Sequence, residues 1–106
     1  MALFALFRAR GPAWRHGRPL EEQPEWPAHA AFMDELAAEG VVLLAGPLED
    51  TGEALVIVRA EGVARAVERL ADDPWTRNGL LQLTRIAGWT LRIGSLPDVP
   101  TSGSPG

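Results

Sequence analysis

Hydrophobic residues follow two different spacings along this chain, and these spacings predict its secondary structure. Four mostly apolar runs are typical of buried strands, at residues 3–8, 41–45, 54–58 and 80–93. Two other stretches place apolar residues three or four positions apart, which predicts amphipathic helices. The first runs from Pro27 to about Glu39. The second turns Val63, Ala66, Val67 and Leu70 inward and ends at Asp73-Pro74.

Glycine, proline and short polar residues mark where these elements stop. Gly40 supplies a left-handed residue after the first helix, and Gly46-Pro47 is expected to halt the second strand. Only a short turn at residues 49–52 separates the second and third strands, so they should form an antiparallel hairpin. Residues 11–24 form a long loop containing several prolines. Residues 95–106 are rich in Pro, Gly and Ser, so we expect one domain over residues 1–94 and a disordered tail.

The order of the predicted elements is β-α-β-β-α-β, which is the ferredoxin-like arrangement of an α+β protein. Both helices of that arrangement cover the same face of the sheet. Three of the strands nevertheless carry apolar side chains in both directions, so the second face also needs a cover. The chain has no residues left for another layer. We therefore expect a homodimer in which two sheets pack face to face as a dimeric α+β barrel.

Composition narrows the possible functions. A chain of 106 residues is long enough for one domain with one core, and a formal net charge of -4 argues against a nucleic-acid partner. The absence of cysteine removes disulfides and thiolate chemistry, and two histidines without a ligand spacing argue against a metal site. The apolar opening at residues 1–7 is too short to cross a membrane. We expect a cytoplasmic protein with no membrane partner.

His29 interrupts an otherwise apolar stripe of the first helix, formed with Phe32, Met33 and Leu36. An imidazole in such a place either has a buried partner, such as a backbone carbonyl, or opens onto a pocket. The candidate partner lies far along the chain, in the turn Asp72-Asp73-Pro74-Trp75. An aspartate before proline is also ordinary turn punctuation, and the spacing alone does not choose between the two aspartates.

The long loop and the tryptophans supply further candidate binding residues. Arg15, His16 and Arg18 would suit an anionic group of a ligand, because guanidinium pairs bidentately with carboxylate. The other interpretation is a solvated loop. Tryptophans could line an aromatic pocket or simply pack; the residues concerned are Trp14, Trp26 and Trp75.

Several motifs in order resemble the YCII-related (YciI-like) family. They are HAAFMDEL from His29, GVVLLAGP from Gly40, Asp73-Pro74-Trp75 with Gly79-Leu80 after it, and the closing Trp89-Thr90-Leu91-Arg92. The resemblance implies a dimeric ferredoxin-like α+β barrel. It also implies an active site in which His29 acts with Asp73. Within the family, dehydrochlorination of a chlorinated hydroxyquinol is a precedent for lyase chemistry.

The leading hypothesis from the sequence is a small enzyme that acts on a small organic molecule without a cofactor. His29 would move a proton, Asp73 would orient it, and Trp14, Arg15, Arg18 and Trp75 would bind the substrate, as in a lyase or isomerase. The alternative is a non-catalytic dimeric binding or scaffold module in which the His-Asp pair is structural. A cofactor-free oxygenase of the dimeric-barrel type is a third possibility.

Overall fold

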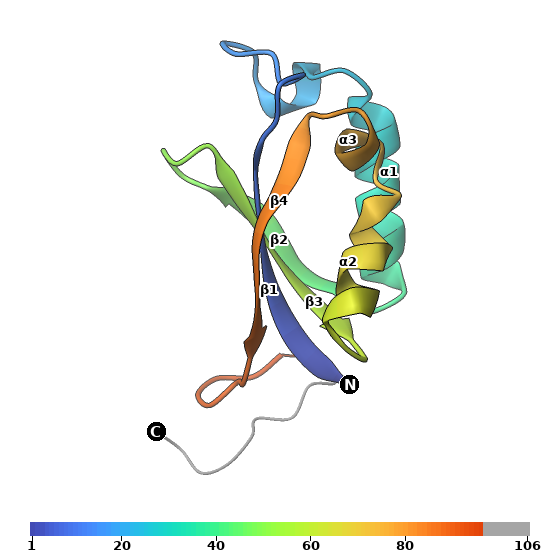
Figure 1. Ribbon diagram of the computed structural model, residues 1–106, viewed down its shortest axis with the longest axis vertical. Coiled ribbons are helices and arrows are strands. Elements are labelled where there is room, and N and C mark those ends of the chain that lie inside the picture. The colour runs from blue at the N-terminus through green and yellow to red at the C-terminus, as the bar shows by residue number, and fades with distance from the viewer. Residues whose placement is uncertain (97–106) are drawn as a thin grey trace.

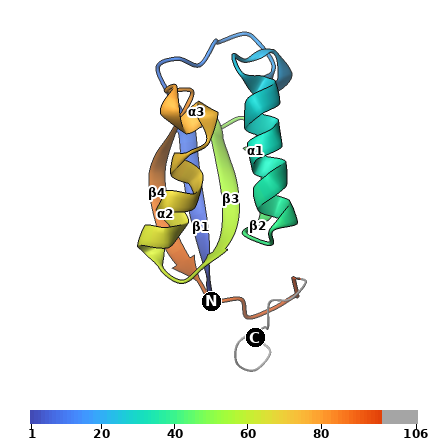
Figure 2. The same cartoon turned by 90° about the vertical axis from the view of Figure 1, so that its right-hand side faces the viewer.

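The computed structural model describes residues 1–96 and shows a mixed α+β fold. Its strands are β1 (Ala2–Arg10), β2 (Val42–Leu48), β3 (Glu53–Ala60) and β4 (Leu81–Trp89). Its helices are α1 (Trp26–Ala38), α2 (Val63–Ala71) and the short α3 (Pro74–Arg77), with a 3-10 turn η1 at Leu20–Glu22. All three α-helices lie on one face of the sheet (Figure 1 and Figure 2).

The sheet has the strand order β2-β3-β1-β4, and every neighbouring pair is antiparallel. The predicted succession of strands and long helices is therefore confirmed, as is the hairpin between β2 and β3. Two elements were not expected. The turn η1 lies inside the long loop, and α3 begins directly after Asp73.

The second strand does not stop at Gly46-Pro47, as the sequence suggested, but continues to Leu48. A proline has no N–H to donate, which excludes it from most central strands. β2 lies at the edge of the sheet and needs only its β3 neighbour. Pro47 pairs there with Ala54 without breaking the ladder.

The last strand is shorter than predicted, because it ends at Trp89 instead of Ile93. The chain then turns back, and Leu91 and Leu96 pack against Leu3 and Ile57 on the sheet face that carries no helix. The predicted tail begins at Ser95; residues 97–106 of it lie outside the described residues.

The ends of α1 follow from local backbone chemistry. Pro27 lies in its first turn, where backbone N–H groups have no acceptor within the helix, so the missing N–H of proline costs no hydrogen bond. Glu25, at the N-cap, adopts a left-handed conformation with φ 59°, and its carboxylate accepts a hydrogen bond from the Asn78 side chain. The helix ends at Ala38, and Gly40 has the left-handed φ of 79° that the sequence predicted.

The second long helix buries less than its pattern indicated. Ala66 and Leu70 are buried against the sheet, but Val63 and Val67 are exposed. With 9 residues the helix is short, so only the positions nearest the centre of its inner face reach the core. Val63 and Val67 lie on the flank of that face.

The space between sheet and helices divides into two regions along β1. An apolar region lies under α1 and α2, and its buried members are Phe4, Leu6, Leu36, Val42, Val56, Val58, Ala60, Ala66 and Leu70. At the other end the buried hydrophobic residues are Trp14, Trp75, Leu80 and Leu81, with Leu20 and Trp26 packed against them. Arg8 is buried on this end of β1.

An irregularity in the sheet marks the boundary between these regions. The register between β1 and β4 shifts between Phe7 and Arg8, where Phe7 pairs with Arg85 and Arg8 with Leu83. The hydroxyl of Thr84, which the shift leaves out, donates to the Phe7 carbonyl at 3.1 Å. Bulges of this kind bend a strand and redirect its side chains.

The sheet face without helices is apolar but only partly covered. Leu44 keeps 52% of its surface exposed and Trp89 keeps 42%. A shallow hollow of about 520 Å³ runs between them over Phe7, Leu55 and Ala87. In residues 1–96, no helix is long and apolar enough to span a membrane.

Candidate active site

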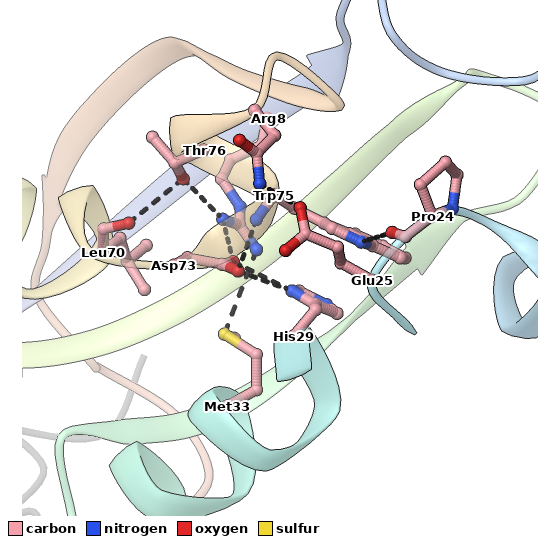
Figure 3. A network of polar contacts seen from close by, with 10 residues as sticks. Arg8, Pro24, Glu25, His29, Met33, Leu70, Asp73, Trp75 and Thr76 are labelled. Atoms are coloured by element: carbon pink, nitrogen blue, oxygen red, sulfur yellow. Dashed lines mark hydrogen bonds and ion pairs between the residues drawn. The ribbon is translucent and has the colours of Figure 1, made fainter. Parts of the chain in front are cut away.

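Three polar side chains from distant parts of the chain meet in the buried space beside the tryptophans (Figure 3). Arg8 comes from β1, His29 from the first turn of α1, and Asp73 is the N-cap of α3. Asp73 is 0% exposed, Arg8 3% and His29 8%. Buried ionisable groups need partners, and here Arg8 and His29 are both partners of Asp73.

The Asp73 carboxylate is the centre of this cluster. It accepts from His29 Nδ1 at 2.8 and 2.9 Å, from Arg8 Nη1 at 2.8 Å and from the Trp75 backbone N–H at 3.0 Å. Burial by itself raises the pKa of this carboxyl. The hydrogen bonds from His29, Arg8 and Trp75 outweigh it, so that the pKa of Asp73 lies below its ordinary value of 3.8. The group is therefore a carboxylate at neutral pH.

The charge on Asp73 decides which nitrogen of His29 carries the proton. A carboxylate can only accept hydrogen bonds, so His29 Nδ1 must be the N–H donor. In the neutral imidazole, Nε2 then keeps its lone pair. His29 Nε2 makes no hydrogen bond to residues 1–96. It is not a buried atom without a partner, because Arg8 Nε is the only such side-chain atom among those residues. His29 Nε2 is therefore in contact with solvent.

Aromatic rings fix the plane of the imidazole. His29 stacks on Trp75 with ring centres 3.8 Å apart and planes 3° from parallel. The Trp75 indole is held in turn by a 2.7 Å hydrogen bond from its Nε1 to the Pro24 carbonyl. Trp26 tilts against both rings, and Trp14 meets Trp75 edge to face at 5.5 Å.

A hollow of about 890 Å³ opens in front of His29. Its lining includes aromatic and basic side chains, namely Trp14, Trp26, Trp75, Arg8, Arg10 and Arg18. The hairpin between β2 and β3 adds the acidic residues Glu49, Asp50 and Glu53. Asp73 does not reach the hollow and lies behind His29 and Arg8. This volume is in the range of small-molecule sites.

This arrangement provides a histidine base that is oriented from behind and open in front. Among the described residues, no three histidine, aspartate or glutamate side chains converge as metal ligands would. The chemistry that the site's own groups offer is proton transfer at His29 Nε2.

The model of the YCII-related domain matches residues 3–90, which is most of the chain. The chain belongs to the YCII-related family. No curated protein matches its sequence significantly.

Among solved structures, this YCII-related protein is similar to 5-chloro-2-hydroxyhydroquinone dehydrochlorinase from Burkholderia phenoliruptrix AC1100, solved in complex with 2,5-dihydroxybenzoquinone. The TM-score is 0.63 at 23% sequence identity, and the alignment covers 84% of this chain and 94% of the dehydrochlorinase. At this identity the similarity shows a common fold.

The structure places most, but not all, of the residues predicted for the site of this YCII-related protein around the hollow. His29 and Asp73 are in direct contact, and Trp14, Trp75 and Arg18 line the hollow. Arg15 does not line it.

The position of Arg15 follows from how the long loop is held. The buried Gln23 side chain bonds both the N–H and the carbonyl of Arg15, at 2.8 Å each, and the Arg18 carbonyl at 3.0 Å. This fixes the loop backbone and leaves the Arg15 side chain exposed to solvent. His16 is exposed as well and does not line the hollow.

The structure also separates the two neighbouring aspartates. Asp72 is 71% exposed and pairs with Arg77 at the surface, whereas Asp73 turns inward to His29. The difference arises at Pro74, which starts α3 and leaves Asp73 in the N-cap position facing the Trp75 N–H. Spacing along the chain does not reveal this.

Sequence reasoning missed Arg8 and Arg10 as residues of the site, whereas Trp26, named there as a possible pocket residue, lines the hollow. A signal for Arg8 was present, because Phe4, Leu6 and Arg8 follow the two-residue period of a strand and must share a face. Arg10 holds its guanidinium 4.9 Å from the Trp14 ring centre at the edge of the hollow.

Proposed function

We propose that this protein is an enzyme that removes a proton from a small, flat organic molecule, in a reaction of the lyase or isomerase type. The observation that carries the proposal is the position of His29. Its Nδ1 is held by a buried carboxylate, and its Nε2 is the atom left to meet a ligand in a hollow of about 890 Å³. A base fixed in this way needs no cofactor to accept a proton.

The proposed step is simple to balance. A C–H or O–H proton of the substrate passes to His29 Nε2, and the bonding electrons stay on the substrate. In a lyase they expel a leaving group as an anion; in an isomerase another atom takes up the proton. Asp73 stabilises the imidazolium that forms and remains ionised, because its pKa is already held low.

The walls of the hollow support a flat ligand. The rings of Trp14, Trp26 and Trp75 give it broad apolar surfaces. Arg10 and Arg18 also line the hollow, and an acidic or enolic oxygen would bind their guanidinium groups, with Arg18 leaving its exposed ion pair with Glu22. The dehydrochlorinase of the same fold was solved with a planar dihydroxybenzoquinone. We propose a related kind of ligand here.

The test uses 5-chloro-2-hydroxyhydroquinone as a probe, with chloride release as the readout. His29→Gln should lower the rate by about 10²- to 10⁴-fold, the usual contribution of a general base. His16→Gln is the matched control and should be unchanged, because His16 lies away from the hollow. If His29→Gln lowers the melting temperature but leaves the rate at that of the unchanged protein, the His-Asp pair is structural and a binding or scaffold module is the better description.

A second matched pair tests the binding surface. Titration with 2,5-dihydroxybenzoquinone should show severalfold weaker binding to Arg18→Ala than to Arg15→Ala. Both arginines lie on the same exposed loop, but only Arg18 lines the hollow. Equal binding by the two variants would remove the loop from the ligand's contacts.

We also propose that the protein is a homodimer in which a second copy covers the sheet face without helices, completing an α+β barrel. Leu44 and Trp89 border an apolar hollow on this face. Burying a large apolar side chain stabilises an assembly by about 1.5–3 kcal/mol. A second copy of the same sheet is the cover that matches this surface in size and character.

Sedimentation of charge-introducing variants tests this assembly. Leu44→Glu should give a monomer at micromolar concentration, whereas Val63→Glu should stay a dimer. Val63 is about as exposed as Leu44, but it lies on α2, on the other side of the sheet. A monomeric unchanged protein would contradict the proposal.

A further inference from the structure

Arg8 is an unusual residue for the place it occupies. It stands on the helix-facing side of β1, two residues after Leu6 and four after Phe4, both of which are buried apolar side chains. Burying a guanidinium is costly unless its charge is compensated. Its Nε also has no partner. A well-packed apolar residue would serve the core better, so the charge calls for a different explanation.

The contacts of Arg8 point to Asp73. Its Nη1 donates to Asp73 Oδ2 at 2.8 Å and lies 3.4 Å from the Thr76 hydroxyl; its Nη2 lies 4.0 Å from the Met33 sulfur. The carboxylate that orients His29 is therefore shared with a permanent cation. Figure 3 shows both side chains converging on it.

Counting charges shows what the sharing does. With neutral His29, the buried group of Arg8, Asp73 and His29 has no net charge, and a proton on His29 makes it +1. Without Arg8 the same group would be -1 with neutral His29 and would become neutral on protonation. Because a net charge is disfavoured in a buried site, the guanidinium favours the neutral imidazole.

We propose that Arg8 is a positioning residue that keeps His29 neutral, and so able to accept a proton, by compensating the charge of Asp73. This rests on the proposed use of His29 as a base. A His-Asp pair without the arginine would be stable as an imidazolium-carboxylate ion pair. In that state the histidine already holds the proton that it is meant to accept.

Other charged groups face the imidazole from the elements around it, and they are exposed or half-buried where Arg8 and Asp73 are buried. Water screens them, so their effect on His29 is weaker. Those that line the hollow are Arg10 on β1, Arg18 in the long loop, Asp34 on α1, and Glu49, Asp50 and Glu53 on the hairpin between β2 and β3. Glu25 is the N-cap of α1, four residues before His29.

A histidine titration by nuclear magnetic resonance tests the proposal without any substrate. The chain has 2 histidines, so His16 serves as an internal reference in every sample. In Arg8→Gln, which removes the positive charge and keeps a polar side chain, the midpoint of the His29 titration should move up by about one pH unit or more. Arg8→Lys keeps the charge and should stay close to the unchanged protein. The His16 midpoint should not move in either variant.

The result that overturns the proposal is an unchanged or lowered His29 midpoint in folded Arg8→Gln, or the same upward shift in Arg8→Lys. If Arg8→Gln does not fold, Arg8→Met takes its place as the uncharged variant and should show the same upward shift of the His29 midpoint. An unchanged or lowered midpoint in folded Arg8→Met would contradict us. Loss of chloride release in His29→Gln is measured separately, so the two proposals can fail independently.

Discussion

The two regions on the helix-facing side of β1 use the same strand in opposite ways. Phe4 and Leu6 enter the apolar region under α1 and α2, whereas Arg8 enters a polar region that it forms with His29 and Asp73. Both regions are buried, and all three β1 residues share a face of the sheet. The difference lies in what burial achieves. In the apolar region each large side chain adds about 1.5–3 kcal/mol of stability. In the polar region desolvation offsets most of the attraction between charges.

The inner face of the sheet is apolar, as stability requires, except at one end. A sheet with two covering helices needs an apolar inner face, and most of β1 and β3 supplies one. The polar region breaks that rule at one end, beside the hollow of about 890 Å³ and next to the bulge in β4. Local violations of packing rules concentrate at functional sites.

The largest effect is expected from Asp73→Ala. This substitution leaves the Arg8 guanidinium buried without its counter-ion and removes the cap of α3. We expect the free energy of unfolding in urea to fall by about 3–5 kcal/mol. Asp72→Ala is the matched control. Its carboxylate forms an exposed ion pair with Arg77, and its loss should cost less than about 1 kcal/mol. Similar losses for the two variants would contradict the assignment of the polar region.

A smaller effect is expected when the cation is removed as well. Arg8→Met in the Asp73→Ala background eliminates the unpaired charge and places an unbranched apolar side chain, about as long as the aliphatic stem of arginine, in its position. The double variant should be more stable than Asp73→Ala alone, with a coupling energy of about 0.5–3 kcal/mol from a double-mutant cycle. Additive losses would show that Arg8 and Asp73 do not interact. In the apolar region a second truncation should not restore stability, because each cavity lowers the free energy of unfolding separately.

The apolar region could be predicted from hydrophobic spacing, whereas the polar region could be predicted only in part. Hydrophobic spacing locates the strands and helices because burial has a period of two in strands and 3.6 in helices. The same spacing singled out His29 as the polar member of a helical stripe. It did not find Arg8, because a strand apolar on both faces hides which positions turn inward. The period shared with Phe4 and Leu6 was the available signal.

Loop geometry accounts for the other misses. Arg15 and Arg18 are equivalent by composition, and only the folded loop, whose backbone Gln23 holds at both residues, shows that Arg18 lines the hollow and Arg15 does not. Asp72 and Asp73 are likewise equivalent until α3 begins at Pro74. The choice of Asp73 came from the family resemblance. Such decisions depend on hydrogen bonds between residues distant in sequence, and no local pattern records them.

The smallest expected effect is a change of stability with pH that belongs to the polar region alone. The pKa of Asp73 is lower in the folded chain than its ordinary value of 3.8. Its ionised form therefore stabilises the fold above that value, and this contribution is lost as the pH falls through 3.8 toward the folded pKa. The stability difference between the unchanged protein and Asp73→Asn should shrink in urea titrations taken from about pH 5 to about pH 3. For Leu6→Ala the difference should stay constant over the same range, because no titrating group is lost. A difference for Asp73→Asn that does not shrink with acid would mean that the carboxyl is not held ionised by His29, Arg8 and the Trp75 N–H.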